Sequence, residues 1–198
     1  MWTGGTGGSP AEERVFKELF NDGILSVAAA GNSGSPKMEY PAGYDPVMSA
    51  AAVDRYSNRA IFSTYNDQVD MAAPGVDILR LRNINSGTAY LSGTSMATPH
   101  VAGVAALLKS LKLNASPLEI REAIELTAID MGIPGRDNLY GHGLIDVEAA
   151  MNMLGGDRAT SPPENVGNCV DFKLTLNTDL YGEESSWSLK LGNGESYK

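Results

Sequence analysis

An eleven-residue run of small and polar residues constrains the fold of this chain more than any other stretch. It reads Gly93-Thr94-Ser95-Met96-Ala97-Thr98-Pro99-His100-Val101-Ala102-Gly103 and continues into a segment rich in alanine and leucine. The pattern predicts a turn that delivers Ser95 to the first turn of a buried helix, with Pro99 in or next to that turn, where backbone N–H groups have no intrahelical partner. A serine at that place lies beside free N–H donors and the positive end of the helix dipole, which would stabilise an oxyanion.

The run from Gly93 to Gly103 resembles the nucleophile motif of the subtilisin-like serine proteases, the subtilases. The resemblance implies that Ser95 is the nucleophile of a serine endopeptidase that hydrolyses peptide bonds. The competing interpretation is a helix N-cap, the usual role of a serine at a helix start. The length of the matching run favours the nucleophile.

A second segment, Ala28-Ala29-Ala30-Gly31-Asn32, ends a predicted buried strand and resembles the A-A-G-N motif of the same family. The resemblance implies that the Asn32 side chain donates an N–H to the oxyanion hole, and that Ala29, Ala30 and Gly31 line the primary specificity pocket. A neutral amide suits this role because its hydrogen bond strengthens only as charge develops on the substrate. Without the resemblance, the segment would be a strand followed by a common Asn/Gly turn.

The N-terminal residues Thr3, Gly4 and Gly5 resemble the S-x-G-G segment of subtilases. The resemblance implies that they form a wall of the substrate pocket and pair with the extended substrate backbone, which is a form of strand addition. Glycines there would let a peptide lie close to the chain. The competing interpretation is a glycine-rich N-terminal tail.

The segment from Tyr40 to Val47 is rich in turn residues and resembles a Y-P-A segment that in subtilases often holds calcium or a monovalent cation. By that analogy a structural cation would contact Ala42, Tyr44, Val47 and Asp70. Ordinary turn structure is the alternative, since carbonyl ligands leave almost no sequence signature. No cofactor is required for the predicted reaction.

The general base is not evident, because the chain has only two histidines. His100 lies about 140° around and 7.5 Å along an ideal helix from Ser95, so we predict a buried, hydrogen-bonded structural histidine. His142 has no carboxylate at a telling spacing and is expected to be exposed. The family's upstream motifs, D-[ST]-G for the aspartate and H-G-[TS]-x-V for the histidine, do not occur in the chain. The resemblance therefore implies a fragment that lacks the catalytic Asp and His and is inactive alone. The alternative is an inactive pseudoprotease that binds peptide or a partner protein.

The fold implied by the resemblance is α/β, a subtilisin-like three-layer fold with a mostly parallel sheet that lacks its N-terminal half. Residues 1–155 would form the C-terminal portion of the catalytic domain, with helices over 9–20, 116–126 and 147–154 and strands over 24–30 and 48–53. Ser9 with Glu12 and Ser116 with Glu119 predict a capping box at the start of the first two helices. The residues expected to face inward are Val15, Phe16 and Leu19 in the first helix and Ile120, Ile124 and Thr127 in the second. Residues 156–168 are rich in Pro, Ser, Gly and Asn, which predicts a linker. Residues 169–198 alternate in polarity over 170–176 and 186–191, which predicts the start of a small β-module.

A formal net charge of −9 argues against a nucleic-acid partner, which requires a basic surface. No apolar run is long enough to span a membrane. The expected partners are protein or peptide substrates, and the complete protein is expected to be a monomer. An extracellular location is implied by the resemblance alone. Cys169 is the only cysteine, so a disulfide within the chain is excluded.

Overall fold

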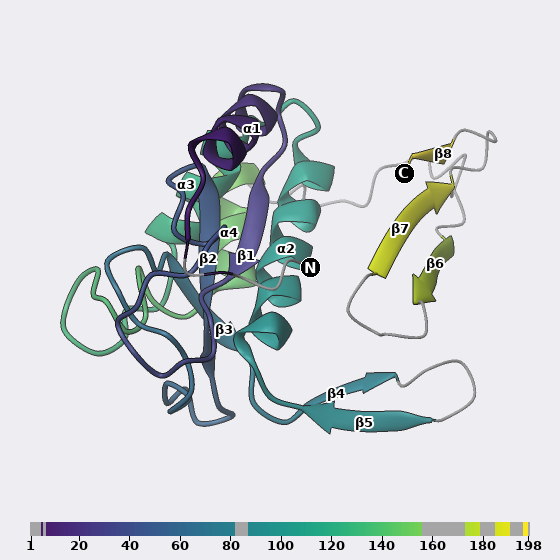
Figure 1. Ribbon diagram of the computed structural model, residues 1–198. Coiled ribbons are helices and arrows are strands. Elements are labelled where there is room, and N and C mark those ends of the chain that lie inside the picture. Colours follow the sequence, from purple (N-terminus) through teal and green to yellow (C-terminus); the bar gives the residue numbers. More distant parts are fainter. Residues whose placement is uncertain are drawn as a thin grey trace. The chain divides into compact units, whose positions relative to one another are not determined.

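The computed structural model describes residues 5, 7–81 and 87–155, together with the backbone of 173–178, 185–190 and 196–197. The chain divides into two units (Figure 1). The larger unit comprises Trp2–Arg80 and Ala89–Asp157, and the smaller one contains the chain from Arg158 onward.

The larger unit is built around a parallel sheet of three strands in the order β1, β2, β3. The strands are β1 (Ser26–Ala29), β2 (Val47–Val53) and β3 (Met71–Pro74). Every residue of β2 is buried, which is typical of a central strand in a parallel sheet that is covered on both faces. The predicted α/β architecture with a parallel sheet is confirmed.

Helices cover both faces of this sheet. Alternate residues of β2, from Met48 to Ala52, join one core cluster with α2 (Thr94–Leu111), α3 (Pro117–Leu126) and α4 (Val147–Gly155). Val47 on the opposite face packs in a cluster with Phe16 of α1 (Pro10–Asn21). The period of two along the strand therefore sorts its side chains between the two helical layers.

Helix α1 differs from its prediction at both its start and its buried face. Ser9 is the N-cap residue, but its side chain accepts no hydrogen bond, and no capping box forms. Glu12, the expected partner, instead accepts a hydrogen bond from the Tyr44 hydroxyl at 2.7 Å. Val15, expected to point inward, is 51 % exposed. The long-range contact with Tyr44 replaces the local capping that the sequence pattern suggests.

Helix α2 begins one residue before Ser95 and carries Pro99 in its interior, not in its first turn. It is also less buried than predicted. One stripe from Ala97 to Leu108 packs against the sheet, while Leu107 and Leu111 are about half exposed. The apolar residues of this segment therefore lie on two faces of the helix, and only one of these faces is buried.

Helix α3 begins with the predicted capping box. The Ser116 hydroxyl accepts from the Glu119 N–H at 3.2 Å, and the Glu119 carboxylate accepts from the Ser116 N–H at 2.8 Å. Hydrogen bonds lower the pKa of Glu119 to about 2. The bond from Lys112 has the largest effect, and the bonds from Ser116 add to it. Ile120 and Ile124 are buried, as predicted.

Because the Ser116 hydroxyl satisfies a backbone N–H that would otherwise lack a partner, Ser116→Ala is expected to lower the free energy of unfolding by about 1 kcal/mol. Urea denaturation followed by circular dichroism measures this. Ser110→Ala is the control, because within the described chain the Ser110 hydroxyl bonds a single group, the Leu107 carbonyl of its own helix. Equal losses in the two variants would contradict the capping role.

Two smaller sheets complete the described structure. β4 (Ile78–Leu81) and β5 (Thr88–Leu91) form a two-stranded sheet that the sequence analysis did not anticipate. β6 (Lys173–Thr178), β7 (Ser185–Lys190) and β8 (Ser196–Tyr197) form an antiparallel sheet in the smaller unit. The predicted linker over 156–168 and Cys169 lie outside the described residues.

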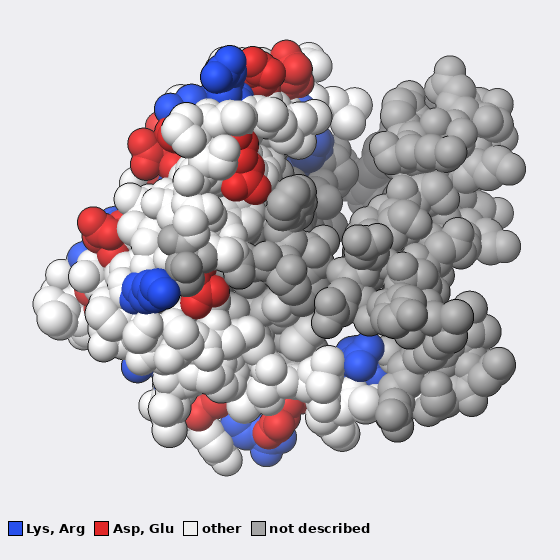
Figure 2. Space-filling view, viewed as in Figure 1, with Lys and Arg blue, Asp and Glu red and all other residues white. Residues whose placement is uncertain are grey.

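The described surface carries charges of both signs. Figure 2 shows acidic and basic side chains scattered over one face, with both signs close together over α1 at the top. Within the described part of the chain, no helix has the length and apolarity needed to cross a membrane.

Candidate functional site

Thr94 connects the two segments singled out in the sequence, although they lie more than sixty residues apart. Its N–H donates to Oδ1 of Asn32 at 2.9 Å, and its hydroxyl donates to the same oxygen at 3.0 Å. The N–H of Gly31 donates to the Thr94 hydroxyl at 3.2 Å. Thr94 is fully buried, so the strand end at Gly31 and the turn before Ser95 are held together from inside the protein.

These bonds fix the orientation of the Asn32 carboxamide. A backbone N–H can only donate, so the atom that faces Thr94 must be the oxygen. The amide Nδ2 of Asn32 then points away from Thr94, and it donates to no protein atom within the described chain. The exposed amide is therefore available as a donor to a group outside the protein, beside the turn that carries Ser95.

Ser95 lies in the first turn of helix α2. The segment that precedes this helix is anchored to the sheet by backbone hydrogen bonds. The Gly93 N–H donates to the Gly75 carbonyl at 2.7 Å, and the Gly75 N–H donates to the Val53 carbonyl at the end of β2 at 2.9 Å. Ser95 is half-buried. Pro99 has no N–H for the carbonyl of Ser95 four residues earlier, so the helix is weakened next to the serine.

Three of the residues expected to line a substrate pocket, Ala29, Ala30 and Gly31, lie at the end of β1. Ala30 and Gly31 are buried and Ala29 is half-buried. Gly5 forms an antiparallel bridge with Tyr40, in which the Gly5 N–H donates to the Tyr40 carbonyl at 3.2 Å and the return bond is 2.9 Å. Thr3 and Gly4 lie outside the described residues.

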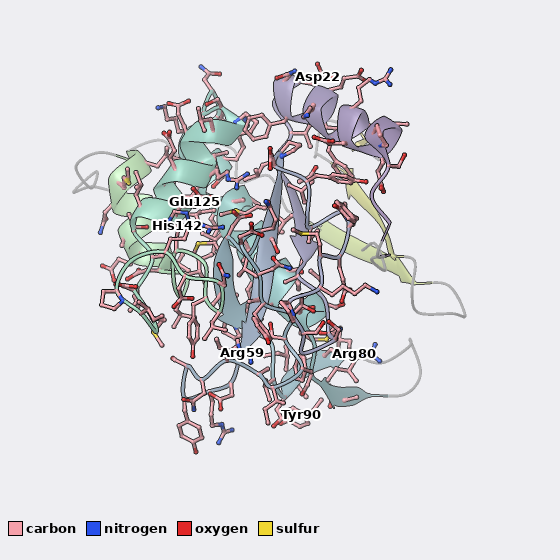
Figure 3. The ribbon with its side chains drawn as sticks, turned by 60° about the vertical axis from the view of Figure 1, so that its left-hand side comes forward. Asp22, Arg59, Arg80, Tyr90, Glu125 and His142 are labelled. Atoms are coloured by element: carbon pink, nitrogen blue, oxygen red, sulfur yellow. The ribbon has the colours of Figure 1, made fainter. Side chains whose placement is uncertain are left out.

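Neither histidine hydrogen-bonds to Ser95 in the described part of the chain. His100 is exposed, not buried as expected, and its Nδ1 lies 2.8 Å from the Met96 carbonyl. His142 does have a carboxylate partner, contrary to expectation, since its Nε2 lies 3.7 Å from Oε2 of Glu125 and it is half-buried (Figure 3). Glu125 comes from α3, seventeen residues away in sequence, so spacing gave no signal of this pair.

The residues expected to contact a cation are buried, but the Asp70 carboxylate already has partners. Its Oδ2 accepts from the Ser49 N–H at 2.7 Å, and its Oδ1 lies 2.8 Å from Nη2 of Arg121. Burial raises the pKa of Asp70, while the Arg121 guanidinium opposes that rise. A cation at Asp70 would have to compete with this guanidinium.

The other three expected contacts are Ala42, Tyr44 and Val47, all buried. The Val47 N–H donates to the Tyr44 carbonyl at 2.9 Å. Among the described residues, no three His, Cys, Asp or Glu side chains gather where a metal could be held. A site made of backbone carbonyls stays a prediction.

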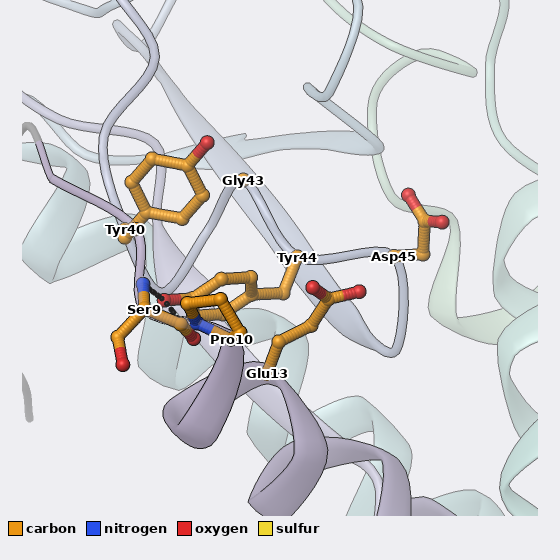
Figure 4. A pocket seen from close by; sticks show the side chains of 8 residues that line it. Ser9, Pro10, Glu13, Tyr40, Gly43, Tyr44 and Asp45 are labelled. Atoms are coloured by element: carbon orange, nitrogen blue, oxygen red, sulfur yellow. Dashed lines mark hydrogen bonds between the residues drawn. The ribbon is translucent and has the colours of Figure 1, made fainter.

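A pocket of about 270 Å³ opens between the start of α1 and the Tyr40–Asp45 loop (Figure 4). The Tyr44 hydroxyl accepts from the Ser9 N–H at 2.7 Å at its base. Neither Ser95 nor Asn32 lines this pocket, so it is separate from the candidate site.

Comparison with known proteins identifies the family of the chain. Residues 2–143 match the model of the Subtilase family. The chain is 47 % identical over 147 residues to the thermostable alkaline protease of Halalkalibacterium halodurans, covering 73 % of this chain and 39 % of that protein. It is 41 % identical over 163 residues to subtilisin BL of Lederbergia lenta, covering 75 % of this chain and 58 % of that protein. The chain thus spans about two to three fifths of the length of these relatives.

Solved structures show the same fold. The psychrophilic subtilisin-like protease Apa1 from the Antarctic psychrotroph Pseudoalteromonas sp. AS-11 superposes with a TM-score of 0.72 at 23 % identity, over 80 % of this chain and 71 % of that one. The prenylagaramide maturation protease PagA superposes with a TM-score of 0.70 at 30 % identity, over 79 % of this chain and 59 % of that one. Together with the bonded pair of Thr94 and Asn32 beside Ser95, these likenesses show that the chain belongs to the subtilase family, the subtilisin-like serine proteases.

Proposed function

We propose that this chain supplies the nucleophile and the oxyanion site of a subtilisin-like serine endopeptidase that acts on protein or peptide substrates. The observation that carries the proposal is the double hydrogen bond from Thr94 to Oδ1 of Asn32, which leaves the amide of Asn32 free beside the turn of Ser95. In this role Ser95 Oγ attacks the substrate carbonyl carbon. The Asn32 amide and the backbone N–H of Ser95 donate to the oxygen as it becomes negative.

The proton of Ser95 needs a base, and in the described part of the chain neither histidine hydrogen-bonds to Ser95, since His100 bonds the Met96 carbonyl and His142 faces Glu125. We expect the base and its orienting carboxylate to come from polypeptide other than residues 1–198, because the relatives are longer than this chain. The 198-residue chain alone is therefore expected to hydrolyse peptides no faster than its Ser95→Ala variant.

The test compares the product of the native gene with its Ser95→Ala variant. Hydrolysis of a chromogenic peptide by the native product is expected to fall by at least about 10³-fold in the variant, and labelling by a fluorophosphonate is expected to disappear, since removal of the serine from subtilisin itself costs more than that. Ser92→Ala is the matched control, because among described residues the Ser92 hydroxyl bonds Asp77 alone, and the variant should leave both readouts unchanged.

Two results would contradict the proposal. The first is hydrolysis by the native gene product that survives Ser95→Ala, which contradicts the role of Ser95. The second is Ser95-dependent hydrolysis by residues 1–198 alone, which supports Ser95 as the nucleophile but contradicts the expectation that the base comes from other polypeptide. A native product that binds peptides without cleaving them would instead support the non-catalytic peptide-binding role. The placement of both histidines away from Ser95 is the observation that keeps this second role open.

The same proposal includes an extracellular location, a monomeric complete protein, no required cofactor, and a structural calcium or monovalent cation at the carbonyls of Ala42, Tyr44 and Val47. These features are supported by the family alone. Residues 169–198 would be a separate β-module, a proposal supported by the antiparallel pairing of β6 with β7.

A further inference from the structure

A carboxylate lies directly against the glycine that precedes Asn32. A methyl group added to Gly31 would collide with the carboxylate carbon and both carboxylate oxygens of Glu39. Gly31 has a φ of +111°, a conformation that other residues rarely adopt, so glycine leaves open the space that the carboxylate occupies. Glu39 is half-buried and stands on the loop before Tyr40.

The position of Glu39 is fixed by its neighbours. The hydroxyl of the fully buried Thr64 lies 3.3 Å from Oε1 of Glu39, and it must donate because a carboxylate only accepts. The Thr64 N–H donates to the Gly31 carbonyl at 2.9 Å. The Ser33 hydroxyl lies 2.9 Å from the Thr64 hydroxyl and supplies it with a second hydrogen bond. One threonine therefore holds both the glycine and the carboxylate that covers it.

No cation neutralises this carboxylate in the described part of the chain. The ion pairs found there involve Glu13, Asp70, Glu119 and Glu125, and none includes Glu39. Among described residues, Thr64 alone donates a hydrogen bond to the Glu39 carboxylate, while the backbone carbonyl of Glu39 accepts from the Gly43 N–H. The carboxylate thus keeps acceptor capacity for a donor that arrives from outside the protein.

Glu39 also lies where a substrate side chain would pass. Gly31 is bonded through Thr94 to the turn of Ser95, and it is the neighbour of Asn32 in the chain. If a substrate carbonyl lies between Ser95 and Asn32, the side chain of the residue that owns this carbonyl branches from the adjacent α-carbon and therefore begins close to Gly31, the neighbour of Asn32. The bridge between Gly5 and Tyr40 places a second wall beside Glu39.

From this placement we infer that the site prefers a substrate with lysine or arginine on the acyl side of the scissile bond, recognised by Glu39. The inference rests on the proposed function, because it assumes that Ser95 and Asn32 bind the scissile carbonyl. An ammonium or guanidinium forms a charge-assisted hydrogen bond with the carboxylate. An apolar side chain would bury the carboxylate without a partner, which is unfavourable, so discrimination has both an attractive and a repulsive part.

The test measures kcat/KM of the native gene product on two peptides that differ only in arginine or leucine at the residue before the cleaved bond. The arginine peptide is expected to be preferred by about tenfold or more, and Glu39→Gln to remove at least that much of the preference by slowing arginine cleavage while leaving leucine cleavage unchanged or faster. Glu122→Gln removes the same charge from an exposed position of α3 and should leave the ratio unchanged. Leucine cleavage by Glu39→Gln shows that this variant is folded.

A parallel measurement on residues 1–198 separates this inference from the proposed catalysis. Calorimetric binding of the two product peptides, ending in arginine or leucine, is compared for the wild-type chain and Glu39→Gln. Tighter binding of the arginine peptide that is lost in Glu39→Gln supports the inference, even if no form of the protein cleaves peptides. Cleavage that depends on Ser95 with an arginine-to-leucine ratio insensitive to Glu39→Gln overturns the inference and leaves the proposed function standing. Equal binding of both peptides in the absence of any cleavage overturns both.

Discussion

A Gly143→Ala variant is expected to lose more than about 4 kcal/mol of its free energy of unfolding, since clash and backbone strain act together at this position. Gly143 has a φ of +128°, and a Cβ there would collide with the carbonyl group of Ile129. The obstacle is backbone, so no side-chain rotation can relieve it. The Ile129 backbone cannot withdraw freely either, because it exchanges two hydrogen bonds with Leu144, at 2.8 and 2.9 Å.

The damage would reach the sheet. The Gly143 carbonyl accepts from the Ala72 N–H at 2.9 Å, and Ile145 donates to the Ala72 carbonyl at 3.0 Å, so this turn extends the ladder beyond β3. A shift of the turn away from Ile129 would break these bonds in a fully buried part of the protein.

Gly135→Ala is the matched control for this prediction. Gly135 also has a positive φ, +86°, but a Cβ there would meet nothing within 4 Å. The free energy of unfolding of this variant should fall only by the cost of placing alanine in a left-handed backbone conformation, about 1–2 kcal/mol. Urea denaturation of both variants measures the difference, which is the contribution of the clash. Similar losses of unfolding free energy in the two variants would mean that the turn at Gly143 can move without destabilising the sheet.

The parts of the fold that were correctly predicted are those that depend on neighbouring residues. The run of small apolar residues from Val47 to Val53 predicts a buried strand, and the Ser-Pro-Leu-Glu sequence from Ser116 predicts a capped helix. The Ser-Pro-Ala-Glu sequence at Ser9 carries the same signal, yet no capping box forms, because the Tyr44 hydroxyl takes Glu12. That contact joins residues 32 apart in sequence, and no local pattern reports it.

The candidate site divides in the same way. Ser95 and Asn32 are visible in the sequence as motifs. Thr94 lies within the first motif, but its bonds to Asn32 span 62 residues, and its role follows only from the folded chain. Glu39 carries no signal at all, since it stands in a turn segment and reaches Gly31 through the packing of the loop against Thr64.

At Asp70, the family resemblance does not predict the partner that this chain provides for the carboxylate. The analogy implies a cation at this carboxylate, and the structure places a guanidinium there, from a helix 51 residues later. Arg121 also pairs with Glu125 at 2.6 Å and donates to the Asp45 carbonyl at 2.7 Å. A signal existed in the spacing of Arg121 and Glu125, which are four apart beside the buried residues Ile120 and Ile124.

Arg121→Met is the second substitution with a large expected effect, a loss of about 3–5 kcal/mol in the free energy of unfolding at neutral pH, because it leaves a buried carboxylate without its partner. The Asp70 and Arg121 side chains are 9 % and 18 % exposed, so water replaces the guanidinium poorly. Lys112→Met is the control, because it breaks the pair with Glu119, in which the two side chains are 46 % and 42 % exposed, and its effect on stability should be far smaller.

The pH dependence of Arg121→Met identifies Asp70 as the cause. Burial already raises the pKa of folded Asp70 above its ordinary value, with Glu125 also raising it and Arg136 lowering it. Loss of Arg121 removes the largest opposing effect and raises this pKa further. A raised pKa in the folded state means that folded Asp70 takes up a proton before the unfolded chain does, so stability is regained as the pH falls through the raised pKa toward 3.8.

The deficit of Arg121→Met relative to the wild type is therefore expected to be full at neutral pH and to shrink steadily in acid. Adding Asp70→Asn to Arg121→Met should recover a large part of the loss at neutral pH and weaken its pH dependence, because an amide in place of the carboxylate removes one of the two acidic groups that lose the guanidinium; the other, Glu125, still lacks it. Urea denaturation from pH 7 down to pH 4 measures both curves. A deficit that stays constant over this range, in the single and the double variant alike, would show that Arg121 stabilises the fold through its bond to the Asp45 carbonyl and its packing, and not through the charge of Asp70.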